Sequence, residues 1–135
     1  MSLKNYHVFI SHSWKHPNPY ETVKRWLDEA NYFIWSDYSV PFYDPLDANT
    51  DRKLKTEIRQ QIASCSCVVI LSGMYVSYSR WINYEIDTAI EMGKPIIGVK
   101  PWSQERIPAK VSENASEIVG WNSASVVQAV RDYSL

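Results

Sequence analysis

The chain has 135 residues, a length that fits one domain with one core, and 45% of them are hydrophobic, as in ordinary globular proteins. No hydrophobic run approaches the roughly 20 residues needed to span a bilayer, and the N-terminal segment lacks the apolar stretch of a secretion signal. The net charge of -1, with both signs scattered along the chain, is not the footprint of a protein that binds nucleic acid or an anionic membrane. We therefore expect a cytoplasmic protein with neither of these partners, although a nucleotide ligand would need only a local site.

Strands and helices are predicted to alternate through the first half of the chain. Short apolar runs predict strands at 7–10 and 32–35, and helical spacing of apolar residues predicts helices at 20–30 and 51–64. Asn49 or Thr50 is the expected N-cap of the second helix. The segment 38–49 contains two prolines and no periodicity, so it is predicted to be a long loop.

The second half continues the alternation. The segment 67–72 is almost entirely apolar, which is typical of a strand buried on both faces of a parallel sheet. A helix is expected at 79–92, ended by Gly93 and Pro95, and a strand at 96–99. A short strand at 118–120 and a helix around 126–130 complete the pattern. Cys65 and Cys67 are expected to be buried free thiols in a reducing compartment.

Five strands that alternate with helices predict an α/β fold with a doubly wound parallel sheet. Ligands of such sheets bind at the carboxyl ends of the strands, where the strand order reverses. The segments expected at that edge are 11–16, 37–49, 72–80 and 100–104.

The first of these segments lacks the usual signatures of nucleotide binding. It contains no glycine, and neither a G-x-G-x-x-G nor a P-loop motif is present, which argues against ordinary hydride transfer and ATP hydrolysis. The three histidines have no metal-ligand spacing, so no metal site is expected. Ser11, His12 and Ser13 could bind a phosphate or ribose, or could equally satisfy the strand end and cap the next helix.

Three stretches together resemble the TIR-domain family. Phe9-Ile10-Ser11-His12-Ser13 resembles the first conserved box, 72–85 resembles the third strand, loop and glutamate-bearing helix, and 94–99 resembles the following strand. The spacing Trp81-x-x-x-Glu85 is the most specific part. The similarity extends to the small prokaryotic subgroup that includes the TIR component of Thoeris antiphage defence. It implies one TIR-like domain over 1–135, with a flavodoxin-like five-stranded sheet of order 2-1-3-4-5.

The resemblance also implies an activity. Enzymatic TIR domains break the bond between nicotinamide and ribose in NAD, and some cyclise the product into a cyclic ADP-ribose signal. By this resemblance Glu85 is the catalytic residue and Trp102 a stacking surface. No cofactor is expected beyond NAD as the substrate. The implied partners are a separate effector protein reached by the nucleotide signal and further copies of the chain.

The chemistry of this reaction suits a site with one essential acid. Nicotinamide leaves from a cationic pyridinium and needs no proton, so one carboxylate can stabilise the oxocarbenium-like ribose and hold its hydroxyls. The residues predicted to bind the substrate around Glu85 are Ser11, His12, Ser13, Asp37, Arg80, Trp81, Tyr84 and Trp102. The competing interpretation of Glu85 is a solvated glutamate on an amphipathic helix that borders the core.

Two other functions stay open at this point. The segment 38–49 lacks the Arg-Asp-x-x-Pro-Gly pattern of receptor TIR domains, yet the chain could still be a non-catalytic interaction module that assembles through this loop and its helices. A nucleoside deoxyribosyltransferase-like enzyme has a related fold and also uses a glutamate, but its additional acidic pair cannot be identified here.

Overall fold

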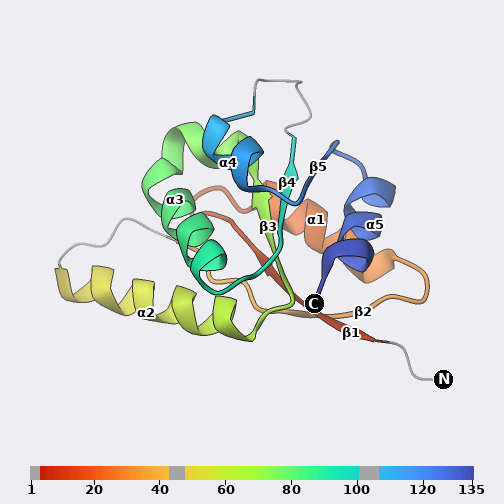
Figure 1. Ribbon diagram of the computed structural model, residues 1–135, viewed down its shortest axis with the longest axis horizontal. Coiled ribbons are helices and arrows are strands. Elements are labelled where there is room, and N and C mark those ends of the chain that lie inside the picture. Colours follow the sequence, from red (N-terminus) through yellow and green to blue (C-terminus); the bar gives the residue numbers. More distant parts are fainter. Residues whose placement is uncertain (1–3, 43–47, 101–106) are drawn as a thin grey trace.

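The computed structural model describes residues 4–42, 48–100 and 107–135. Their strands form one parallel sheet in the order β2-β1-β3-β4-β5 (Figure 1). The strands are β1 (Asn5–Ile10), β2 (Ile34–Asp37), β3 (Cys67–Leu71), β4 (Ile96–Val99) and β5 (Glu117–Val119). The predicted flavodoxin-like sheet of order 2-1-3-4-5 is confirmed.

Helices cover both faces of this sheet (Figure 1). One face carries α1 (Asn18–Glu29) and α5 (Ser123–Tyr133), and the other carries α2 (Ala48–Ser64), α3 (Tyr75–Glu91) and α4 (Ala109–Asn114). A short 3-10 turn, η1 (Ser72–Met74), links β3 to α3. Each face has its own hydrophobic core, and all five residues of β3 are buried between the two cores. The nearly continuous apolar sequence of β3 follows from this double coverage.

The strand order places a switch point between β1 and β3. The chain leaves β1 toward β2 on one side, whereas β3 continues toward β4 on the other. Ile10 is paired with Val69 in this register, and the Ser11 N–H donates to the Val69 carbonyl at 2.9 Å. In parallel sheets of this order, ligands bind beside the switch point at the carboxyl ends of the strands. Ser11 therefore lies where a ligand is expected.

Several predicted boundaries were wrong by a few residues. The strand β2 begins at Ile34 rather than at 32, because Tyr32 has a φ of +52° in the preceding turn. The helix α2 begins at Ala48, so Asn49 and Thr50 lie inside its first turn and neither is its N-cap. The helix α3 begins at Tyr75, and its backbone is kinked at Tyr78, where φ is -133° and ψ is 31°.

Both cysteines are buried and free, as expected. Burial raises the pKa of the Cys65 thiol to about 12 and that of the Cys67 thiol to about 11, so neither is poised to act as a thiolate. Within the described ranges, no helix combines the length and the hydropathy required to cross a bilayer.

Gly98 in β4 allows α4 and β5 to approach the strand closely. A Cβ at this position would lie 2.9 Å from Val111 Cγ1 and 3.4 Å from Ile118 Cγ1. We predict that Gly98→Ala lowers the free energy of unfolding by about 1–3 kcal/mol, because the packed core must shift to admit a methyl group. Urea denaturation measures this change. The control is Gly120→Ala, whose Cβ would meet its nearest neighbour at 3.5 Å. Equal effects of the two substitutions would contradict the prediction.

Candidate active site

The loops that follow β1 and β2 are joined at the carboxyl edge of the sheet. The Phe42 N–H donates to the His12 carbonyl at 3.0 Å, and the Trp14 N–H donates to the Phe42 carbonyl at 3.0 Å. The Phe42 side chain is fully buried, and its ring centroid lies 5.1 Å from that of Tyr78 at the kink of α3. The segments that follow β1, β2 and β3 thus meet at this edge.

Glu85 lies under this edge and is fully buried on α3. Neither of its carboxyl oxygens has a hydrogen-bond partner among the described residues. Ser11 Oγ and Trp81 Nε1 share this condition, as does Ser134 Oγ near the end of the chain. Trp81 precedes Glu85 by about one helical turn, so both side chains lie on the same side of α3. Native proteins leave few buried polar groups unpaired, so Ser11, Trp81 and Glu85 together form the candidate site.

Burial dominates the electrostatics of Glu85. It raises the pKa of the Glu85 carboxyl well above its usual value of 4.5, and the neighbouring Ser11 hydroxyl lowers this pKa only in part. No hydrogen bond of good geometry joins the two side chains, so their proximity lowers the pKa without satisfying either group. Burial therefore keeps Glu85 a neutral acid over a wider pH range than a solvated glutamate.

Ser11 and Ser13, in the loop that follows β1, have different hydrogen-bond environments. Ser13 Oγ accepts the Lys15 N–H at 3.1 Å, which is a local turn contact. The helix α1 begins after Pro17 without a side-chain cap, so none of Ser11, His12 and Ser13 caps it. Of the two interpretations that the sequence left open, stabilisation of the loop applies to Ser13. Because the Ser11 hydroxyl has no partner among the described residues, Ser11 keeps the interpretation as a ligand-binding residue.

Asp37 is the last residue of β2, and its carboxylate already has hydrogen-bond donors within the protein. Its carboxylate accepts hydrogen bonds from the Tyr20 hydroxyl and, at 2.9 Å, from the Ser39 N–H. Burial and the bond to Asp37 raise the pKa of the Tyr20 hydroxyl. Sequence reasoning missed Tyr20, because its position in the first turn of an amphipathic helix carried no sign that its ring would reach His12.

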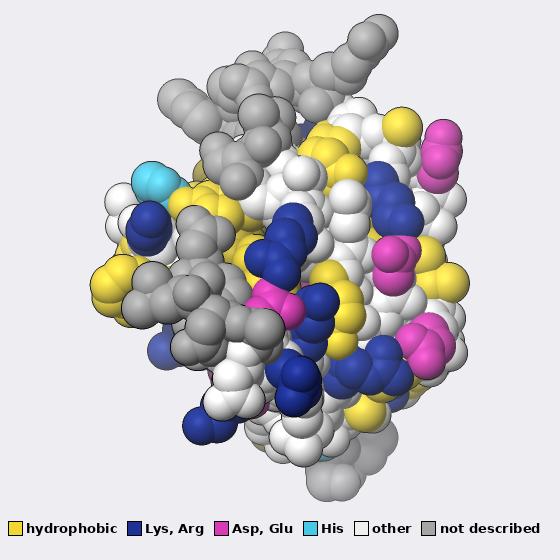
Figure 2. Space-filling view, turned by 90° about the vertical axis from the view of Figure 1, so that its left-hand side faces the viewer, with side chains coloured by type: hydrophobic (Ala, Val, Ile, Leu, Met, Phe, Trp, Pro, Cys, Tyr) yellow, Lys and Arg dark blue, Asp and Glu magenta, His cyan; other side chains and the backbone are white. Residues whose placement is uncertain are grey.

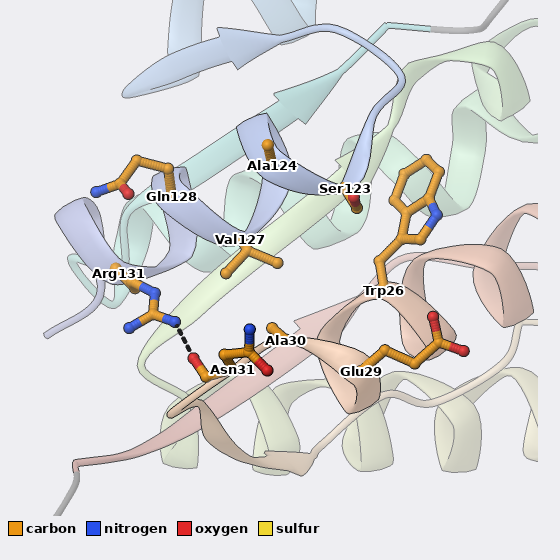
Figure 3. A pocket seen from close by; sticks show the side chains of 9 residues that line it. All are labelled: Trp26, Glu29, Ala30, Asn31, Ser123, Ala124, Val127, Gln128 and Arg131. Carbon is orange, nitrogen blue, oxygen red and sulfur yellow. Dashed lines mark hydrogen bonds between the residues drawn. The ribbon is translucent and has the colours of Figure 1, made fainter.

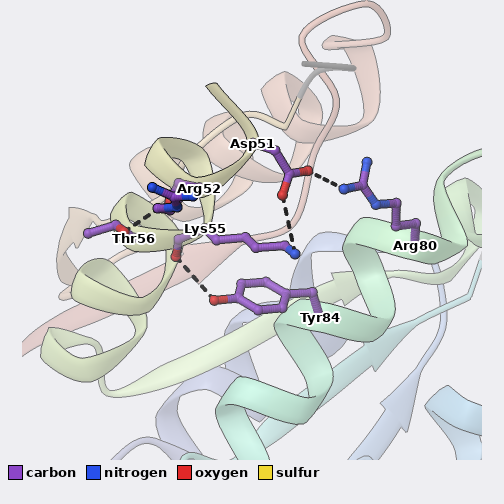
Figure 4. Close-up of polar contacts among 6 residues, drawn as sticks. All are labelled: Asp51, Arg52, Lys55, Thr56, Arg80 and Tyr84. Carbon is purple, nitrogen blue, oxygen red and sulfur yellow. Dashed lines mark hydrogen bonds and ion pairs between the residues drawn. The ribbon is translucent and has the colours of Figure 1, made fainter. Parts of the chain in front are cut away.

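The outer surface of α2 and α3 is rich in Lys and Arg side chains with Asp and Glu side chains between them (Figure 2). Arg80 belongs to this surface and forms an ion pair with Asp51, which also pairs with Lys55 at 3.2 Å (Figure 4). The Arg80 guanidinium lies 4.7 Å above the centroid of the Trp81 ring. Arg80 therefore covers Trp81 from outside and already has an anionic partner.

Tyr84 points toward α2 rather than joining the cluster around Glu85. Its hydroxyl donates to the Lys55 carbonyl at 3.3 Å (Figure 4), and its ring meets the edge of the Trp81 ring with centroids 6.3 Å apart. Ser11, Trp81 and Glu85 are thus the predicted residues that the structure brings together as unpartnered polar groups. Trp102 lies outside the described residues.

A separate pocket of about 540 Å³ lies between α1 and α5 (Figure 3). Trp26 and Val127 contribute apolar lining, and Arg131 donates to the Asn31 carbonyl at 2.7 Å at one end. None of the predicted site residues lines it, and it belongs to the face of the sheet opposite α3. It is therefore distinct from the candidate site formed by Ser11, Trp81 and Glu85.

The model of the family described as Thoeris protein ThsB, TIR-like domain, matches residues 9–106. The chain belongs to this family. The match spans both the carboxyl end of β1 and the whole of α3, so it includes Ser11, Trp81 and Glu85. The ThsB TIR-like chain is thereby placed among the TIR proteins of Thoeris antiphage defence, and the predicted resemblance is confirmed.

A solved structure of a CMP N-glycosidase, BcmB, from Clostridium botulinum is similar in fold. It is 18% identical, with a TM-score of 0.56, and the alignment covers 94% of this chain and 99% of that chain. A search of curated proteins gave no match.

The unpaired carboxyl of Glu85 has a consequence for the stability of this ThsB TIR-like chain. The raised pKa means that the folded state binds a proton more tightly than the unfolded state. Stability is therefore greatest below the ordinary pKa of glutamate, and it falls as the pH rises from there toward the folded pKa, by up to about 1.4 kcal/mol per pH unit.

We predict that Glu85→Gln removes this pH dependence, so the variant gains stability over the native protein as the pH rises above 4.5. Thermal unfolding from pH 4 to pH 8 measures the difference. The control is Glu57→Gln, at an exposed position of α2. If native protein and Glu85→Gln kept a constant difference over this range, the burial of an unpaired acid would be refuted.

Proposed function

We propose that this chain cleaves the nicotinamide–ribose bond of NAD and joins the product into a cyclic ADP-ribose-type signal that a separate effector protein detects. The observation that carries the proposal is the fully buried, unpartnered carboxyl of Glu85 beside the unpartnered Ser11 Oγ and Trp81 Nε1. Buried titratable groups with strongly shifted pKa values concentrate at catalytic sites. Membership of the Thoeris TIR-like family supports this assignment.

The charge of the substrate complements that of the site. The nicotinamide ring of NAD is a cationic pyridinium, and a nearby positive charge favours the ionised form of a carboxyl. Substrate binding is therefore expected to ionise Glu85, although burial alone raises the pKa of its carboxyl. The resulting carboxylate stabilises the positive charge that develops on the ribose as nicotinamide leaves with the bonding electron pair. A second acid is not needed, because the leaving group is neutral on departure.

Enclosure of the site favours cyclisation over hydrolysis. Glu85 and Trp81 are buried, and Phe42 lies under the adjoining loops, so water has little access to the reacting carbon while the site is closed. The adenosine end of the same substrate can then act as the nucleophile in place of water. An aromatic wall would hold the adenine ring near the ribose, and Trp102 is our candidate for that wall.

Glu85→Gln is predicted to lower the rate of NAD consumption by at least about 100-fold, because the amide cannot carry the negative charge that stabilises the ribose cation. The assay incubates concentrated protein with NAD and identifies products by mass spectrometry. The control is Glu91→Gln, at an exposed position of the same helix that pairs with Arg59. Full turnover by a folded Glu85→Gln variant would refute the role of Glu85.

The same assay separates the alternative functions. The CMP N-glycosidase of similar fold makes CMP the second substrate to test, and release of cytosine with no NAD product would favour a nucleotide N-glycosidase of that type. Transfer of a deoxyribose between two bases would indicate a deoxyribosyltransferase-like enzyme. Concentration-dependent assembly that survives Glu85→Gln, with no turnover of NAD in native protein, would identify an interaction module.

Trp102→Ala is predicted to weaken NAD binding by about 1–3 kcal/mol, the usual contribution of one base stacked on an aromatic ring. The apparent affinity for NAD in the cleavage assay measures this loss. Tyr133→Ala is the control, because Tyr133 is an exposed aromatic side chain at the end of α5. An unchanged affinity in Trp102→Ala would exclude stacking on this residue.

A further inference from the structure

His12 is a buried histidine whose two ring nitrogens have different surroundings. The side chain is 6% exposed, and its Nδ1 lies 3.0 Å from the Ile10 carbonyl oxygen. A carbonyl can only accept a hydrogen bond, so Nδ1 must carry the hydrogen. Burial lowers the pKa of His12, although the Ile10 carbonyl and Asp37 oppose this in part. The neutral ring therefore presents a lone pair at Nε2, and no described residue donates to it.

Tyr20 fixes the plane of the His12 ring. The two rings are stacked, with centroids 3.8 Å apart and an interplanar angle of 12°. The Tyr20 hydroxyl donates to the Asp37 carboxylate, which also accepts the Ser39 N–H. Ser39 Oγ in turn accepts the Ile10 N–H at 2.8 Å. The ring that supports His12 is thus tied to the ends of both β1 and β2, so Nε2 is held in one orientation.

We propose that His12 recognises the sugar of the substrate, its Nε2 accepting a hydrogen bond from a hydroxyl of the nicotinamide ribose, and that Tyr20 is the positioning residue that holds His12 in place. This inference rests on the proposed function. The reacting ribose must lie at Glu85 on α3, and Ser11, the neighbour of Glu85, directly precedes His12 at the carboxyl end of β1. The His12 side chain lies on the other side of this strand end, against Tyr20 of α1. A ribose bound across the end of β1, where ligands of such sheets bind, would lie between Glu85 and His12. Among the hydrogen-bond donors of NAD, the hydroxyls of that ribose are therefore the ones expected near His12.

The variant that isolates this contact is His12→Asn. The asparagine amide can replace Nδ1 as the donor to the Ile10 carbonyl, but it is too short to replace the acceptor at Nε2. The substrates are NAD and two analogues that lack either the 2′- or the 3′-hydroxyl of the nicotinamide ribose. We expect native protein to lose at least about tenfold in kcat/KM with one analogue, because Nε2, covered by the bound substrate, is then left without a donor.

His12→Asn should show this loss already with NAD, and the same analogue should cause no further loss. If the variant distinguished NAD from the analogue as strongly as native protein does, His12 would have only a packing role and the inference would be overturned.

Two substitutions of Tyr20 test its positioning role. Tyr20→Leu removes the stacked ring, whereas Tyr20→Phe keeps the ring and removes only the hydroxyl that binds Asp37. Nitrogen-15 NMR of the imidazole should show a single tautomer with the hydrogen on Nδ1 in native protein. Tyr20→Phe, which keeps the stacked ring but loses its bond to Asp37, should lie between native protein and Tyr20→Leu. In Tyr20→Leu the spectrum should show a mixture of tautomers, together with reduced discrimination between NAD and the analogue. An unchanged tautomer and unchanged discrimination in Tyr20→Leu would refute the assignment.

The NMR measurement also separates this inference from the proposed function, because it needs no turnover. Titration with ADP-ribose should shift the Nε2 resonance in native protein, and titration with nicotinamide alone should not. If native protein responds in this way but does not cleave NAD, the proposed function fails and the sugar contact stands. If NAD is cleaved and His12→Asn behaves as native protein, only the inference fails. If ADP-ribose causes no shift, the sugar contact is refuted.

Discussion

The central constraint in this protein is the burial of the Glu85 carboxyl, which has no hydrogen-bond partner among the described residues. Burying Glu85 raises the free energy of its ionised form, and neither Ser11 nor Trp81 offsets that cost with a well-formed hydrogen bond. A hydrophobic residue at this position of α3 would give a more stable core. Under the proposed function, the pyridinium cation of NAD would offset this cost when the substrate binds.

The fold supplies the means to hold this acid at a binding edge. The strand order brings the end of β1 beside β3, and the helix that follows β3 carries Glu85 back under the same edge. Tyr78, at the kink of α3, packs against the Phe42 ring of the loop that follows β2. The Asp51–Arg80 ion pair ties α2 to α3 above Trp81 on the outer surface. Because Glu85 and Trp81 are buried, the proposed function requires these segments to move before NAD can reach Glu85.

Much of the fold could be predicted from the sequence because its apolar patterns are strong. The wholly apolar β3 and the helical spacing in α2 and α3 indicate a sheet covered on both faces. The spacing of Trp81 and Glu85 correctly put them on one side of a helix, but periodicity alone could not distinguish a bordering glutamate from a fully buried one. Two contacts could not be predicted: the stacking of His12 on Tyr20 and the ion pair between Arg80 and Asp51. Each joins different elements of the fold, and local sequence patterns do not encode such contacts.

The most direct test of the account is the titration of the Glu85 carboxyl by carbon-13 NMR. The measurement compares the empty protein with its complex with a carbocyclic NAD analogue, which keeps the pyridinium but resists cleavage, and Glu85→Gln identifies the signal. We predict that the pKa of Glu85 lies well above 4.5 in the empty protein, because the carboxyl is desolvated. We also predict that the analogue lowers it, because a cation favours the ionised form. A carboxyl that titrates near 4.5, and does not respond to the analogue, would contradict the account.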